Sequence, residues 1–163
     1  MAVREIPNNM FFTNVKHIID SGNSVELRIK GTSMYPTLLN GKHKVVLIPY
    51  QKQYLQVGSI ALFEYENKYI LHRLKLVNGN QLVFQGDNLP SVREHVEEGN
   101  IVGIVEYIIS PDGKITDCKK RRFFIKSKLW LPICQRYLWF IRKMKCFFIK
   151  AFAYKNQKGW NKE

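Results

Sequence analysis

Two residues in this chain have the chemistry of a nucleophile and its base. Ser33 lies in the segment 31–38, GTSMYPTL, and His72 follows 39 residues later, directly after the apolar run 69–71. A serine hydroxyl is a poor nucleophile until a base removes its proton, and a neutral imidazole does this near pH 7. The pair therefore predicts nucleophilic catalysis, with His72 as the general base for Ser33.

The backbone around Ser33 favours an exposed hydroxyl. Gly31 follows a predicted strand and tolerates backbone angles that other residues avoid, so the chain can turn sharply there. At such a turn the N–H groups of Ser33 and Thr32 are expected to point at a developing oxyanion. An isolated Gly-Thr-Ser is more often a simple turn, so the assignment depends on the rest of the chain.

The elements that must position these residues are one short helix and many short strands. Apolar residues recur at helical spacing from Phe11 to Ile19, and Gly22 follows where a helix would stop. From Ser24 onward apolar and charged residues alternate with the period of a strand. Further strand-like runs occupy 44–48, 59–65, 68–76, 81–84 and 101–109, with turns at Asn40-Gly41, Asn78-Gly79 and Asp112-Gly113. The pattern predicts a mainly β, small antiparallel barrel-like domain.

Charge divides the chain into two parts. Residues 1–117 carry 12 Lys/Arg and 12 Asp/Glu, whereas residues 118–163 carry 14 Lys/Arg and one acidic residue, Glu163. The whole net charge of +13 therefore belongs to the C-terminal part. We predict a β domain over 1–117, with its N-terminal helix, and a basic aromatic tail over 118–163.

The tail has the pattern of a basic amphipathic helix that begins or breaks at Pro132. Its charges interrupt every apolar run well short of the ~20 residues that span a bilayer. The first interpretation is an interfacial helix on an anionic membrane, and the second is a helix that packs on protein. Nucleic-acid binding is not expected, because no nucleic-acid-binding domain accompanies the charge. Its apolar positions include Trp130, Ile133, Tyr137, Phe140, Ile141, Met144, Phe147, Phe148 and Ala151.

Other features bear on location and cofactors. Cys118, Cys134 and Cys146 are spaced neither as a disulfide framework nor as a zinc site, which favours a reducing compartment. The first residues lack the basic start and apolar block of a secretory signal. We expect a cytoplasmic protein, peripheral on the inner membrane face, with no cofactor and no metal.

Several blocks of residues occur in a fixed order along the predicted β domain. They are GTSMYPTL at 31–38 with Asn40-Gly41, VGSIALF at 57–63, ILHRL at 70–74 and QGDN at 85–88. In this order they resemble the nucleophile, hydrophobic-strand, general-base and Gly-Asp-Asn blocks of the superfamily of signal peptidase I and LexA-like serine peptidases. Each block alone is a weak signal, and four in order are a strong one.

The resemblance, over roughly 24–109, implies roles for residues of this chain. A histidine at position 72 resembles the endoplasmic-reticulum-type and some bacterial signal peptidases, whereas most bacterial members use lysine. In the histidine-type relatives an aspartate lies several residues beyond the Gly-Asp-Asn block. Here Glu94 is the nearest substitute and Asp87 the alternative, a Ser-His dyad remains open, and His95 is assigned no role. Gly31 stands where many relatives supply a hydroxyl to the oxyanion hole, so only backbone donors are expected.

The resulting hypothesis is a serine endopeptidase that cleaves a peptide or a leader-type segment in trans. The segment before the β domain is too short for a DNA-binding domain, and the chain lacks an Ala-Gly hinge, which argues against repressor self-cleavage. The alternative is a catalytically inactive relative that binds peptides or assembles on a membrane surface. The missing aspartate favours this alternative.

Overall fold

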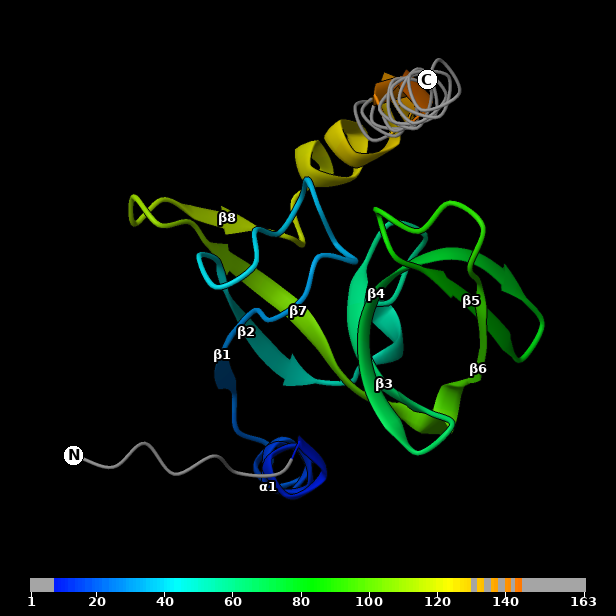
Figure 1. Cartoon of the computed structure of the whole chain (residues 1–163). Helices are drawn as coiled ribbons and strands as arrows, with labels where there is room; N and C mark the ends of the chain where they lie inside the picture. The colour runs from blue at the N-terminus through cyan, green and yellow to red at the C-terminus, as the bar shows by residue number, and fades with distance from the viewer. Residues whose placement is uncertain (1–7, 130–131, 134–135, 138–139, 142, 145–163) are drawn as a thin grey trace, which may run out of the picture.

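The computed structural model describes residues 8–129, 132–133, 136–137, 140–141 and 143–144. One N-terminal helix precedes a run of short strands, and a second helical segment follows them (Figure 1). The elements are α1 (Asn8–Asp20), β1 (Val25–Arg28), β2 (Lys44–Pro49), η1 (Lys52–Tyr54), β3 (Ile60–Tyr65), β4 (Lys68–Asn78), β5 (Gln81–Gln85), β6 (Glu94–Glu97), η2 (Glu98–Asn100), β7 (Ile101–Ile109) and β8 (Ile115–Asp117).

The strands form one antiparallel sheet in the order β1-β2-β7-β3-β4-β5-β6, with β8 paired to β7. Strand β6 returns into contact with β3, so β3 to β6 curl into a small barrel, while β1, β2, β7 and β8 form the other half (Figure 1). Strand β4 is the longest strand, with 11 residues. It pairs with β3 along its first half and with β5 along its second half.

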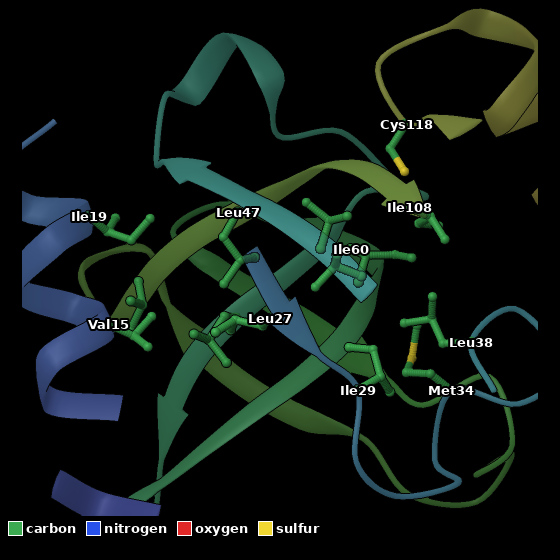
Figure 2. Close-up of a cluster of buried hydrophobic side chains, with 14 of the residues drawn as sticks. Val15, Ile19, Leu27, Ile29, Met34, Leu38, Leu47, Ile60, Ile108 and Cys118 are labelled. Atoms are coloured by element: carbon green, nitrogen blue, oxygen red, sulfur yellow. The ribbon is translucent and has the colours of Figure 1, made fainter. Parts of the chain in front are cut away.

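The sheet encloses two apolar clusters. The first gathers Val15 and Ile19 of α1 with residues of β1, β2, β3 and β7, and it also includes Met34 and Leu38 from the loop after β1 (Figure 2). The second fills the small barrel, where Phe63 of β3 packs against Phe84 of β5 with ring centroids 4.5 Å apart. Because Met34 and Leu38 are buried, the loop that carries Ser33 packs against the first apolar cluster.

The sequence-based expectation of a mainly β, antiparallel domain is confirmed. The N-terminal helix is present, and Gly22 stands just past its end with a φ of 85°. Two short strands, β6 and β8, were not predicted. Strand β6 reads Glu-His-Val-Glu and buries Glu94 together with Val96, so one inward position is charged and the apolar alternation is lost.

The C-terminal helix, defined as residues 121–129 with the described helical positions up to 144, starts against the sheet. Phe123 is buried in the first cluster, close to Cys118. Within the described residues, no helix is long and apolar enough to cross a bilayer. The predicted tail positions Trp130, Cys134, Cys146, Phe147, Phe148 and Ala151 lie outside the described residues.

Candidate active site

Ser33 lies in the loop between β1 and β2, which spans residues 29–43. Gly31 has a φ of 93°, in the left-handed region that glycine adopts without strain, and its N–H donates to Asn40 Oδ1 at 2.9 Å. Met34 and Leu38 anchor the far side of the loop in the core, while Ser33 remains partly accessible. The local sequence therefore produces the turn that was expected from the Gly-Thr-Ser motif.

A second loop holds the Ser33 loop in place. The backbone N–H of Asn88 donates to the Ser33 carbonyl at 2.7 Å, and its side-chain amide donates to the Thr32 carbonyl at 3.0 Å. Asn88 belongs to the Gly-Asp-Asn block that follows β5. Since both bonds leave from one residue, they fix the position and the orientation of the loop relative to β5.

His72 lies on β4 with its side chain turned into the small barrel. The residue is only 4% exposed, and its ring lies edge-on to Phe63 at 6.4 Å between centroids. Its Nδ1 lies 3.0 Å from Oε2 of Glu94, which is itself buried on β6. When Nδ1 carries the proton donated to this carboxylate, Nε2 keeps its lone pair and can accept a proton.

The other ring nitrogen of His72 faces the Ser33 loop. A Cβ atom placed on Gly86 would lie 2.9 Å from His72 Nε2 and 2.8 Å from the Ser33 carbonyl oxygen. Both atoms therefore border the same small space, which only a glycine leaves open. No hydrogen bond between the Ser33 hydroxyl and His72 occurs among the described residues. Such bonds are often long in ligand-free enzymes and tighten when substrate binds.

Asp87 has a different partner. Arg73 donates from Nε to Asp87 Oδ1 and from a terminal nitrogen to Oδ2, both at 2.8 Å, and the pair is almost fully buried. Thr37 of the Ser33 loop donates to Asp87 Oδ2 at 2.5 Å and accepts from Arg73 at 3.2 Å. Arg73 also donates to the Gly58 carbonyl at 2.7 Å. This network ties the exit of the Ser33 loop to β4 and to the Gly-Asp-Asn block.

The two backbone N–H groups expected at an oxyanion hole have no acceptor among the described residues. Neither the N–H of Ser33 nor that of Thr32 donates a hydrogen bond to another described residue. Donors that the fold leaves unpaired in a partly exposed loop are suited to a developing negative charge. Within the described part of the chain, no cluster of His, Cys, Asp and Glu side chains has the arrangement of a metal site.

Burial changes the titration of two basic groups near the loops. The pKa of Lys75 on β4 is lowered, mainly because the side chain is partly withdrawn from water, although the carboxylate of Asp87 opposes this shift. Burial also lowers the pKa of His43, whose Nδ1 accepts from the Leu39 N–H at 3.0 Å. Within the described residues, neither group forms a hydrogen bond or an ion pair with Ser33 or with His72. Their shifts follow from packing beside the loops.

The structure thus pairs the side chains of His72 and Glu94, places the Ser33 backbone close to the histidine, and gives Asp87 a separate environment. Glu94 contacts His72 Nδ1, and His72 Nε2 borders the Ser33 backbone at Gly86, whereas the Asp87 carboxylate binds Arg73 and Thr37. Sequence reasoning had left the choice between the two carboxylates open. It also missed Arg73, Thr37 and Asn88 as residues that position the loop, although all three lie in the ILHRL, GTSMYPTL and QGDN blocks.

This arrangement is of the serine-peptidase type: an antiparallel β domain that carries a serine on a tight loop beside a buried imidazole paired with a carboxylate. The sequence profile of the Peptidase S24-like family matches residues 2–106. The chain therefore belongs to the Peptidase S24-like family. This membership supports a place in the superfamily of LexA-like peptidases and signal peptidases, and it indicates a function of the serine-peptidase type. No curated protein sequence matches the chain significantly.

Proposed function

We propose that the protein is a serine endopeptidase of the histidine-base type that cleaves a peptide supplied by another molecule. The observation that carries this proposal is the two-sided environment of His72. Its Nδ1 is held by Glu94 at 3.0 Å, and its Nε2 borders the Ser33 backbone across Gly86. A base that is oriented on one side and directed at a serine loop on the other has the geometry of a Ser-His-carboxylate catalyst.

The proposed reaction has two halves. The Ser33 hydroxyl adds to the scissile carbonyl carbon while its proton passes to His72 Nε2, and the carbonyl oxygen becomes an oxyanion near the Ser33 and Thr32 N–H groups. The C–N bond then breaks, His72 returns the proton to the leaving amine, and an acyl ester remains on Ser33. Water repeats the sequence, which releases the acid and restores the serine.

Two unpaired strand edges offer a place for the substrate. Strand β1 pairs only with β2, and β4 pairs with β5 only from Arg73 onward, so the β4 residues up to His72 have one open edge among the described strands. An extended peptide can add its backbone to such an edge. Because no described strand of the chain fills it, this geometry favours a substrate from another molecule.

The test is labelling and cleavage with matched variants. Wild-type protein, Ser33→Ala and His72→Ala are treated with a fluorophosphonate probe and with candidate leader peptides. His95→Ala is the control, because His95 lies on β6 next to Glu94 but is exposed. We expect wild type and His95→Ala to react and the other two to fail, with unchanged circular dichroism.

The same experiment separates the rival function. A catalytically inactive relative would bind peptide without cleaving it, and wild type and Ser33→Ala would then give the same probe signal and equal peptide affinity. That result would overturn the peptidase proposal. Cleavage that persists in Ser33→Ala would overturn it as well, since another group would then have to be the nucleophile.

A further inference from the structure

The C-terminal helix exposes a continuous apolar stripe. Its members are large apolar side chains that follow one another at intervals of three or four residues, and all of them are exposed. Residues three or four apart share one face of a helix. We define this apolar stripe as Ile125, Leu129, Ile133, Tyr137, Phe140 and Met144.

The β domain does not cover this stripe. Leu129 and Tyr137 each keep 65% of their surface exposed, whereas Phe123, at the start of the same helix, is buried in the core. Phe124 packs near Gly58, since a Cβ atom there would lie 2.9 Å from its ring. Figure 1 shows residues 121–129 leaving the sheet beyond the end of β8. The helix is therefore anchored at its first turn and unpartnered along the stripe.

Five exposed cations of the helix form no ion pair with a carboxylate among the described residues. Lys119 and Lys120 form ion pairs with Glu106 and Asp117 at the edge of the sheet. The following exposed cations have no described carboxylate within ion-pair distance; they are Arg121, Arg122, Lys126, Lys128 and Arg136. The segment 118–163 contains a single acidic residue, so the chain has little with which to neutralise them locally.

We propose that the apolar stripe and its flanking cations dock the protein on an anionic lipid bilayer surface. The stripe would enter the headgroup boundary while the lysine and arginine side chains meet lipid phosphates. A second copy of this chain is a weaker occupant, because pairing two such helices would bring like charges together. A nucleic acid would neutralise the cations but would leave the apolar side chains in water.

The anchor of the helix links the proposed membrane surface to the candidate active site. The Arg73 guanidinium lies over the Phe123 ring, 5.4 Å from its centroid, and Arg73 binds Asp87 next to the loop that holds Ser33. A membrane-bound helix would thus hold the Ser33 loop in a fixed orientation to the bilayer. Docking itself does not depend on the proposed peptidase activity.

The test is co-sedimentation of the full-length protein with vesicles of phosphatidylcholine alone and with vesicles that also contain phosphatidylglycerol. Binding is measured at 0.1 M and at 1 M salt, where the Debye length falls from ~10 Å to ~3 Å. We expect binding to the anionic vesicles at low salt. The double variant Leu129→Glu/Tyr137→Glu should bind at least about tenfold more weakly, because two apolar side chains no longer enter the lipid.

Two controls keep the test specific. Leu76→Glu removes an exposed leucine of β4, 52% exposed, and adds the same kind of charge away from the helix, so it should bind vesicles nearly as wild type does. Light scattering of lipid-free protein reports self-association. Equal binding of the stripe variant and wild type, absence of binding to anionic vesicles, or a stripe variant that changes only the oligomeric mass would overturn the proposal.

A failure of docking can be distinguished from a failure of the peptidase proposal. Ser33→Ala should bind vesicles as wild type does, and the stripe variant should cleave a soluble peptide at the wild-type rate. Loss of both properties in the stripe variant, with altered circular dichroism, would report misfolding. The variant Lys126→Gln/Lys128→Gln then replaces it, with a smaller expected loss that disappears at 1 M salt.

Discussion

Strand β4 carries two consecutive residues, His72 and Arg73, that each pair with a buried carboxylate. The two pairs differ in whether the basic side chain keeps a hydrogen-bonding atom without a partner. His72 and Arg73 point to opposite faces of the sheet, as successive strand residues do. His72 meets Glu94 through one ring nitrogen, and its second nitrogen borders the Ser33 loop. Arg73 uses its donors on Asp87, on Thr37 and on the Gly58 carbonyl.

The difference separates the chemical role that we propose for His72 from the structural role of Arg73. The Arg73–Asp87 pair has two parallel hydrogen bonds and a hydroxyl that bridges both partners, so it fixes three segments of the chain. The His72–Glu94 pair fixes one side of a ring that can exchange a proton. Both pairs are buried, so burial alone does not distinguish them. The proposed catalytic role of His72 rests on its second ring nitrogen, Nε2, which forms no hydrogen bond within the described residues.

The largest effect is expected from removal of the base. His72→Ala should lower kcat by about 10⁶-fold, since the members of such a unit act together. The melting temperature should change far less than activity. His95→Ala, the exposed neighbour of Glu94, should keep the wild-type rate. Comparable losses in both variants would break the distinction between the buried and the exposed histidine.

The next effect concerns the orientation of the ring. Glu94→Gln should lower kcat by about 10⁴-fold with little change in KM, because a neutral amide no longer favours the proton on Nδ1. Glu94→Asp should recover part of the rate. Glu97→Gln is the control, since Glu97 lies three residues further along β6 and is exposed. If kcat were unaffected in Glu94→Gln, the protein would be a Ser-His dyad.

Disruption of the Arg73–Asp87 pair should lower the stability of the fold. Asp87→Asn leaves the Arg73 guanidinium buried without its anionic partner, and we expect a loss of about 3–5 kcal/mol in the free energy of unfolding. Urea denaturation measures it. Asp20→Asn, at the exposed end of α1, should change stability by no more than about 0.5 kcal/mol. A stable Asp87→Asn protein that has lost only activity would reassign Asp87 to the chemistry.

The smallest of these effects tests the space between the serine loop and the imidazole. In Gly86→Ala the new methyl group would lie under 3.0 Å from the Ser33 carbonyl oxygen and from His72 Nε2, so the loop has to shift. We expect about a hundredfold loss of kcat/KM and about 1–3 kcal/mol of destabilisation. Gly99→Ala is matched, because a Cβ atom there meets nothing within 4 Å. Similar activity in both variants would contradict the close approach.

Periodic segments made most of the fold predictable. Short strand-like runs bounded by turn residues located five of the strands after β1 to within about two residues. Consecutive residues of β3, β5 and β7 are buried, so these strands read as apolar runs. The pattern failed for β6, where Glu94 occupies an inward position, and for β8, which has only three residues. The turn between β3 and β4 falls in the gap between the predicted runs 59–65 and 68–76, and its residues Glu66 and Asn67 adopt positive φ without a glycine.

The amino-acid sequence by itself determined the candidates: a serine on a glycine turn, a histidine on a strand, two nearby carboxylates and a basic amphipathic tail. It did not determine which carboxylate meets the histidine, because that depends on the pairing of β5 with β6 and on the path of the Gly-Asp-Asn loop. The tertiary structure decided which carboxylate meets the histidine through the register of β5 and β6. Glu94 sits opposite Phe84 on the face that His72 shares, while Asp87 turns toward Arg73 on the other face.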